Sequence, residues 1–255
     1  MDEKIINKRG QIAIFIIVAI LIVAVVALFF KFRVSPTLSG EREFNPETYI
    51  EQCLRQEAID KINLIVEQGG FFNPLNYKIY NDVKATYLCE NINYYEPCIN
   101  QHPALLSEIE NELNKEMNLI AGNCFASFKE EATRRNFVIS GEVNEVIVEL
   151  RPGFVETSVF SDLVISSGEN SQSFSEIKAI VQTPLTDLAY VASEIVRQEA
   201  QFCHFSTEGY SLLYRDFDVR RNIMSDSTKI YTIKHRDTAR KMHIAIRGCA
   251  IPAGF

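Results

Sequence analysis

The sequence predicts an α+β protein in which an N-terminal transmembrane helix is followed by helices packed on an antiparallel sheet. Three observations predict it. An uncharged run of nineteen residues extends from Ile12 to Phe30. Apolar residues then recur at helical spacing over residues 50–65 and 105–120. From residue 137 onward the chain is rich in β-branched and aromatic residues between short turns, which favours strands.

The apolar run is long enough to cross a membrane. Nineteen residues span roughly 28 Å as a helix, close to the thickness of a bilayer's hydrocarbon core. Cleaved secretory signals usually end in small residues, whereas this run ends in Phe-Phe-Lys-Phe-Arg. We therefore expect a retained transmembrane helix over residues 11–30. The basic residues Lys4, Lys8 and Arg9 favour a cytoplasmic leader over residues 1–10, and so an extracellular C-terminal domain.

All six cysteines follow the apolar run, which is typical of a domain in an oxidising exterior. Six cysteines allow 15 pairings, and buried reduced thiols in a cytoplasmic domain are the alternative. Three pairings are suggested by position. Cys53 and Cys124 lie at corresponding depths of two predicted helices, Cys89 and Cys98 would close a small loop, and Cys203 and Cys249 bracket the C-terminal section.

The residues Lys8, Arg9, Gly10 and Gln11, followed directly by the apolar run, resemble the class III signal peptide of archaeal type IV pilins and archaellins. In that family a prepilin-type peptidase cuts after the glycine, and the hydrophobic helix stays on the mature protein and can form a filament core. The resemblance covers only the N-terminal segment and implies a processing site between Gly10 and Gln11. An ordinary signal anchor is the alternative.

Two features depart from the pilin pattern. Phe15 stands at the fifth mature position, where pilins usually carry Glu, and Ser35-Pro36 interrupts a helix that pilins continue into the head domain. Both departures weaken filament assembly more than membrane anchoring. The layout, with an early helix that contains a cysteine and ends in Gly-Gly, also resembles uncharacterised anchored proteins of small-genome archaea, which implies no function.

The rest of the chain is acidic and large enough for one substantial core. Residues 34–255 carry 21 Lys and Arg against 31 Asp and Glu, a net charge of −10. We expect a linker over residues 31–44 and an extracytoplasmic α+β domain over 45–255. This domain could divide into a helical part, 45–135, and a sheet part, 136–255.

Three helices are expected in the domain. Asn45 can cap the first, Pro46 suits its first turn, and Gly69-Gly70 ends it. The second runs from about residue 103 to 121, with Gly122 as its stop. The third runs from Pro184 to about residue 200. Strands are expected over residues 137–139, 143–150, 154–165, 174–181, 229–234 and 242–247, and a short hairpin and loop over 71–102.

Two stretches are candidate binding surfaces. The segment 71–102 is rich in tyrosine, and Tyr87, Tyr94 and Tyr95 could form a recognition loop, or cover the domain with their rings. Residues 211–255 contain nine Lys and Arg but only four Asp, which gives a net charge of +5. A patch that includes Arg220 and Arg221 could meet an acidic glycan, lipid headgroups or an acidic partner. The alternative is a set of solvated strand faces and edges.

No stretch of the sequence identifies a reaction. The four histidines stand in none of the common hydrolase, metalloprotease or nucleotide-binding motifs, so we expect no catalytic residues, cofactor or metal. Cys89, Cys98 and His102 could supply three zinc ligands, but a disulfide explains the two cysteines more simply. An acidic extracellular domain disfavours nucleic-acid binding.

The sequence therefore favours a single-pass, pilin-like surface protein with a structural or adhesive role. Its expected partners are the membrane, the prepilin-type peptidase, and further copies or other pilin-like surface proteins. An anchored module that binds an extracellular ligand is the second hypothesis. An anchored enzyme is the third.

Overall fold

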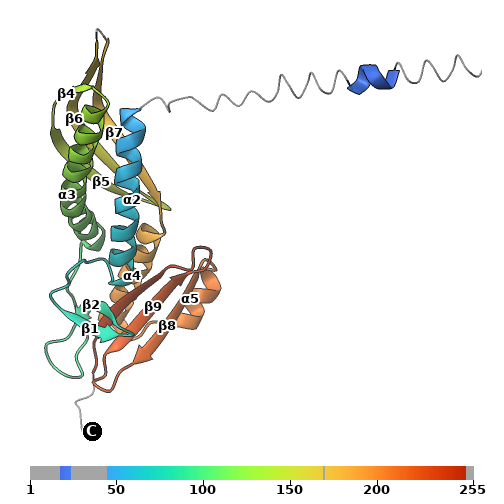
Figure 1. Ribbon diagram of the computed structural model, residues 1–255. Coiled ribbons are helices and arrows are strands. Elements are labelled where there is room, and N and C mark those ends of the chain that lie inside the picture. The colour runs from blue at the N-terminus through green and yellow to red at the C-terminus, as the bar shows by residue number, and fades with distance from the viewer. Residues whose placement is uncertain (1–17, 24–44, 169, 251–255) are drawn as a thin grey trace, which may run out of the picture. The chain divides into compact units, whose positions relative to one another are not determined.

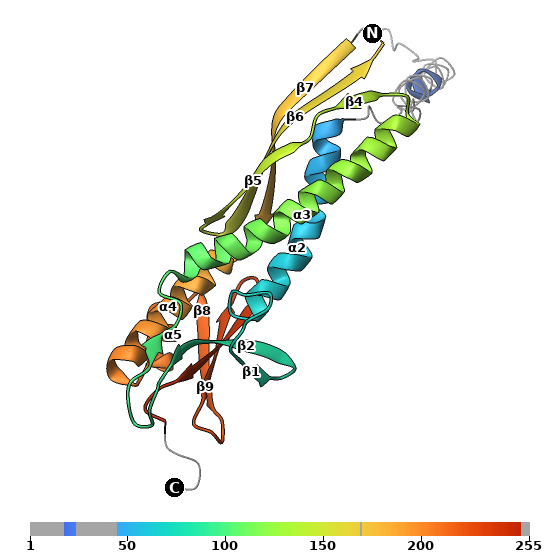
Figure 2. The same ribbon diagram turned by 90° about the vertical axis from the view of Figure 1, so that its left-hand side faces the viewer.

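Figures 1 and 2 show a computed structural model of the chain, which describes residues 18–23, 45–168 and 170–250. The predicted leader, the processing site at Gly10 and Gln11, and most of the apolar run and linker lie outside these residues. Residues 18–23 are helical and exposed. Within the described ranges no helix is both long and apolar enough to cross a membrane. Residues 46–255 group into one compact unit, separate from residues 1–45.

The compact unit is an α+β domain, as the sequence predicts. Its helices are α2 (Pro46–Glu67), α3 (Leu105–Arg134), α4 (Leu185–Phe202) and α5 (Thr207–Leu213). Its strands are β1 (Tyr77–Tyr80), β2 (Val83–Glu90), β3 (Ile99–Asn100), β4 (Val138–Ser140), β5 (Val143–Arg151), β6 (Phe154–Ser167), β7 (Asn170–Gln182), β8 (Phe217–Ile223), β9 (Lys229–His235) and β10 (Lys241–Arg247).

The strands form two sheets. Sheet A has six strands in the order β1-β2-β10-β9-β8, with β3 beside β2, and its β2–β10 pair is parallel while its other pairs are antiparallel. Sheet B has four strands, with β6 between β7 on one side and β4 and β5 on the other, all antiparallel. The early hairpin therefore joins the C-terminal strands, and the meander of residues 138–182 forms a sheet of its own.

Helices α2 and α3 run antiparallel beside sheet B, and α4 lies between the two sheets (Figures 1 and 2). The apolar stripe of α2 is buried as predicted, from Ile50 to Ile65. Two side chains of α3 accept hydrogen bonds from the edge strand β5: Asn114 Oδ1 from the Val148 N–H, and Glu110 Oε1 from the Leu150 N–H, both at 3.0 Å. These bonds satisfy edge groups that would otherwise be open to another strand.

Helix α3 continues three turns beyond the predicted stop at Gly122, so that prediction is wrong. A side chain at Gly122 would meet nothing within 4 Å, which places this glycine on the solvent side of the helix. Beyond it Cys124, Phe125 and Phe128 continue the buried face. Their burial outweighs the roughly 1 kcal/mol that an interior glycine costs a helix. Helix α5 and strand β8 were not predicted from the sequence.

Three disulfides join the same cysteines that the sequence suggests. Cys53 of α2 is bonded to Cys124 of α3 with a Cα–Cα distance of 5.9 Å, and Cys89 of β2 to Cys98 with 5.4 Å. Cys203, after α4, is bonded to Cys249, after β10, with a Cα–Cα distance of 5.9 Å. None of the six cysteines is free.

The C-terminal end of α2 is docked on sheet A. The Thr86 hydroxyl of β2 donates a hydrogen bond to the Gln68 carbonyl. Gly69 follows at φ +76°, and a Cβ there would lie 2.8 Å from the His243 carbonyl oxygen of β10. Only glycine allows both this backbone conformation and this close approach. The Gly-Gly that ends the helix in the sequence therefore also fixes the helix to the sheet.

We predict that Gly69→Ala lowers the free energy of unfolding by about 1–3 kcal/mol, because it adds a steric clash to a strained φ. Gly153→Ala is the matched control, since Gly153 has φ +80° but open space around it. Denaturant titration of the two variants separates the cost of the steric clash, present only at Gly69, from the cost of the positive φ, present at both glycines. Equal losses would show that the contact with the His243 carbonyl is unimportant.

Candidate functional site

Sheet A is curled so that its two edges approach each other. Lys78 Nζ of the edge strand β1 lies 2.6 Å from Asp226 Oδ2 in the β8–β9 turn. Asn222 of β8, the other edge strand, donates a hydrogen bond to the Tyr80 hydroxyl of β1. One face of the sheet is therefore concave. A cluster of Ala85, Tyr87, Ile230 and Ala245, with Tyr80 and Met224 against it, fills part of this face.

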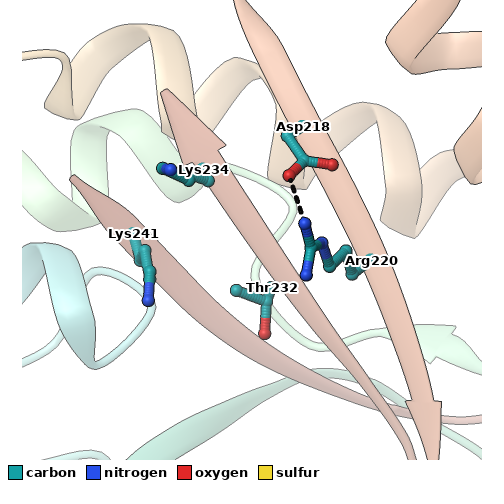
Figure 3. Close-up of a pocket in the computed structure, with 5 residues that line it drawn as sticks. All are labelled: Asp218, Arg220, Thr232, Lys234 and Lys241. Atoms are coloured by element: carbon teal, nitrogen blue, oxygen red, sulfur yellow. Dashed lines mark hydrogen bonds and ion pairs between the residues drawn. The ribbon is translucent and has the colours of Figure 1, made fainter. Parts of the chain in front are cut away.

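The open part of the concave face is basic (Figure 3). A cavity of about 150 Å³ is lined by Asp218, Arg220, Thr232, Lys234 and Lys241. Strand register brings these residues together: Lys234 pairs with both Asp218 and Lys241, and Arg220 pairs with Thr232. Because side chains alternate along a strand, residues 232 and 234 of β9 share this face.

The charges of this cavity are incompletely balanced. Arg220 Nη2 lies 3.1 Å from Asp218 Oδ2, while its side chain remains 77% exposed. No carboxylate of the described residues lies within 4 Å of the amine of Lys234 or Lys241. Two like charges directly opposite each other on neighbouring strands destabilise a sheet. The pair Lys234 and Lys241 therefore destabilises the fold, and its amines are available to bind an anion.

A second, wider cavity adjoins the first. It has a volume of about 490 Å³ and shares Lys241 with the first cavity. The other residues of its lining are Glu67, Asn81, Val83, Thr238, Ala239, Arg240 and His243. Lys241 therefore lies between two cavities, both of which are lined by cationic side chains and hydrogen-bonding groups. We call the two cavities together the basic groove.

His243 links the two cavities and is uncharged. Its Nδ1 lies 3.0 Å from the Thr232 hydroxyl, and its ring contacts that of Tyr80 with centroids 5.7 Å apart. Burial lowers the pKa of His243, and the nearby Lys241 lowers it further against the opposing effect of Glu67. The imidazole therefore acts as a neutral wall of the groove and not as a third cation.

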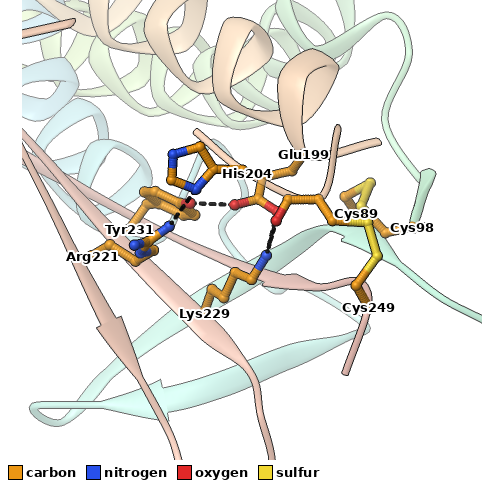
Figure 4. Close-up of polar contacts among 9 residues, drawn as sticks. Cys89, Cys98, Glu199, His204, Arg221, Lys229, Tyr231 and Cys249 are labelled. Atoms are coloured by element: carbon orange, nitrogen blue, oxygen red, sulfur yellow. Dashed lines mark hydrogen bonds and ion pairs between the residues drawn. A yellow bond between two sulfur atoms is a disulfide. The ribbon is translucent and has the colours of Figure 1, made fainter. Parts of the chain in front are cut away.

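The opposite face of sheet A carries a buried ionic cluster (Figure 4). Glu199 of α4 is fully buried, and Lys229 Nζ lies 2.5 Å from its Oε2 and donates a second bond to the Cys203 carbonyl at 2.7 Å. The Tyr231 hydroxyl donates to the other carboxylate oxygen, Oε1. Burial raises the pKa of Tyr231, and the hydrogen bond to Glu199 raises it further, so the phenol stays protonated.

This cluster is structural. Both carboxylate oxygens of Glu199 have partners, and the groups join α4 to β9 beside the Cys203–Cys249 disulfide. Its charges are neutralised within the domain. The concave face therefore remains the better candidate for a binding site.

The structure separates the tyrosines that the sequence analysis grouped. Tyr87 lies in the core of the concave face, 7% exposed, with its hydroxyl 2.9 Å from that of Thr228. Tyr94 packs against Arg247, whose guanidinium lies 5.3 Å from the ring centroid. Tyr95 is exposed, with φ +67°. These three residues do not form one binding surface.

The two candidate arginines lie on opposite faces of β8. Arg220 lines the basic groove, whereas Arg221 lies on the face of the buried cluster, with Nη1 3.4 Å from His204 Nδ1. Sequence reasoning did not identify Lys234, Lys241 or Thr232 as members of the site. Alternation in the β9 sequence Lys-Ile-Tyr-Thr-Ile-Lys-His would have placed residues 232 and 234 on one face.

The residues considered for zinc have other partners. Cys89 and Cys98 are bonded to each other, and His102 Nδ1 lies 2.6 Å from Glu108 Oε2. The His102 ring also packs against that of Phe71 in a tilted arrangement, with centroids 4.5 Å apart. These contacts give the segment 71–102 a structural role. They also account for the residues without a metal.

A third surface is apolar. Leu212, Leu213 and Tyr214, at the end of α5, are 77%, 80% and 53% exposed. The ring of Tyr214 stacks on that of Tyr210, with centroids 4.4 Å apart. Burial raises the pKa of Tyr210 to about 12, so its phenol is neutral. Exposed apolar side chains gathered on one short helix are typical of a contact with another macromolecule.

Comparison with protein-family models, with curated proteins and with solved structures finds no match.

We predict that Glu199→Gln lowers the free energy of unfolding by about 3–5 kcal/mol, because it leaves the Lys229 cation buried without a counter-charge. Glu194→Gln is the matched control, since Glu194 pairs with Arg197 at 2.6 Å on the exposed side of the same helix. We expect the control to cost less than about 1 kcal/mol. A double variant that adds Lys229→Met should recover much of the loss in denaturant titrations, and full additivity would contradict a direct ion pair.

We predict that the domain loses stability as the pH falls below about 6.5, the ordinary pKa of histidine. The unfolded chain takes up a proton at the ordinary histidine pKa, whereas the lowered pKa of His243 keeps the folded imidazole neutral. The contribution of His243 is thus present above about pH 6.5 and is lost below it. Melting curves of His243→Gln should show a flatter pH dependence than those of the unmodified chain.

Proposed function

We propose that this chain is a membrane-anchored, extracytoplasmic surface protein of pilin-like organisation that acts by adhesion or assembly. One observation carries the proposal: all six cysteines of the domain form three disulfides. Such pairing is stable in an oxidising exterior and rare in reducing cytosol. The apolar run at residues 12–30 precedes every cysteine and supplies the anchor.

The arrangement of the domain suits this role. The linker enters at Pro46, the first residue of α2, and sheet A packs on the other end of the same helix through Gly69. A helix of 22 residues is about 33 Å long. The basic groove, on sheet A, therefore lies well away from Pro46, the residue at which α2 begins. This separation is what an adhesive or ligand-binding role requires.

Two surfaces support two forms of the proposal. The exposed end of α5 favours assembly with further copies or with other surface proteins, because apolar side chains there have no cover within the described residues. The basic groove favours an anchored module that captures a ligand. In the pilin-like form, a prepilin-type peptidase cuts between Gly10 and Gln11.

The proposal predicts three disulfides and an external domain in the native protein. Intact mass of the membrane-extracted chain should rise by about 6 Da on reduction, two hydrogens for each bridge. Protease added to intact cells should digest the domain. A domain that is digested only after lysis would overturn the external location.

The same mass tests processing. Loss of residues 1–10 would support the pilin-like form, and Gly10→Val should then retain the leader because the peptidase requires the glycine. An intact N-terminus in the unmodified chain would leave a plain signal anchor and favour the ligand-binding module.

A further inference from the structure

The strongest unexplained feature of the domain is the pair Lys234 and Lys241. The two lysines are direct cross-strand partners on the concave face, and Arg220 lies on the next strand of the same cavity. Two other lysines of sheet A are neutralised by carboxylates: Lys78 by Asp226, and Lys229 by Glu199. A like-charge pair that the fold does not balance is typical of a site that binds an anion.

The groove offers more than positive charge. Asp218 and Glu67 supply carboxylate oxygens, Asn81 supplies an amide, and Thr232 and Thr238 supply hydroxyls. Carboxylates repel a bare polyanion such as a chain of phosphates, but they accept hydrogen bonds from hydroxyl groups. The groove is therefore complementary to a molecule that carries anionic groups and free hydroxyls together.

The shape of the groove favours a chain over a single ion. Lys241 lines both cavities, so Arg220, Lys234 and Lys241 follow one another across β8, β9 and β10, and Arg240 lies next to Lys241 in the β9–β10 turn. The smaller cavity, about 150 Å³, has no aliphatic or aromatic residue in its lining. A lipid surface would require apolar side chains beside the cations, as in interfacial helices. The lining of the smaller cavity therefore does not suit a membrane surface.

We propose that the basic groove binds an acidic polysaccharide, a chain of sugars that bears carboxylate or sulfate groups. Arg220, Lys234, Lys241 and Arg240 contact the anionic groups, and Asp218, Glu67 and Asn81 accept or donate hydrogen bonds at the hydroxyls. The proposal rests on the proposed function, because an external domain is the one that meets such polymers. The net charge of −10 over residues 34–255 confines the contact to the groove and makes binding strongly dependent on salt.

The test is calorimetric titration of the full chain, purified in detergent, at low and at physiological salt. Polygalacturonate supplies carboxylates and dextran sulfate supplies sulfates, so these two probes distinguish the anionic group. Neutral dextran, polyphosphate and single-stranded DNA are the comparison polymers. We expect one or both acidic polysaccharides to bind, more weakly as salt rises, and no binding of neutral dextran. Equal or tighter binding of polyphosphate or DNA would overturn the proposal.

The decisive variant is the double substitution Lys234→Gln with Lys241→Gln. It should weaken binding at least tenfold while leaving the melting temperature unchanged or higher, because it removes a repulsive pair. The matched control, Lys115→Gln with Lys178→Gln, removes two exposed positive charges from α3 and sheet B and should leave binding unchanged.

Three outcomes would reject the groove as the site: no binding by the unmodified chain, an equal loss in the control, or a lower melting temperature of the double variant without a loss of binding. These outcomes are separate from the topology experiment. A domain that is external but binds no polysaccharide contradicts this inference alone, whereas a cytoplasmic domain contradicts the proposed function.

Discussion

The parallel pairing of β2 with β10 is the constraint on which the rest of sheet A depends. It joins residues 86–90 to residues 244–247, and without it β1, β2 and β3 and the C-terminal strands β8, β9 and β10 would be two separate three-stranded pieces. Contacts between residues so far apart in sequence carry a large loop-closure cost. Two disulfides and the docked end of α2 lie beside this pair. The disulfides persist in the unfolded chain and restrict its freedom.

Strand β9 shows how one strand serves two purposes. Lys229 and Tyr231 point to the face covered by α4, where Glu199 neutralises the cation and accepts the phenol's hydrogen bond. Thr232 and Lys234 point to the concave face, where Lys241 stands directly opposite. On the face covered by α4, the buried Lys229 cation would strongly destabilise the fold if it had no counter-charge. On the concave face, solvent screens the repulsion between Lys234 and Lys241. The covered face supplies stability and the open face supplies a surface for recognition.

The domain combines a rigid part, formed by α2, α3 and sheet B, with a polar binding surface on sheet A. Disulfide Cys53–Cys124 ties α2 to α3, and the side chains of α3 close the edge of β5. These contacts hold the helices and sheet B as one body. Sheet A packs on the C-terminal end of α2. Gly69 is required at this contact because a side chain there would clash with the His243 carbonyl oxygen of β10.

Local patterns in the sequence were sufficient for most of the elements. Helical spacing located α2 and α4, and period-two composition located the strands between residues 138 and 182, because these signals arise from neighbours along the chain. The end of α3 was misjudged, since Gly122 weakens a helix locally while Phe125 and Phe128 stabilise it through packing. Strand β8 carries a run of polar residues that hides its buried Val219.

The sequence by itself determined the class of the domain, the positions of α2 and α4, the start of α3 and the cysteines available for bridging. Only the tertiary structure decided which charges meet. Arg220 and Arg221 are adjacent in the sequence but lie on opposite faces of β8, and Lys234 and Lys241 become neighbours through the register of β9 and β10. A binding site made from separate strands is set by sheet pairing, and pairing depends on contacts that no local pattern specifies.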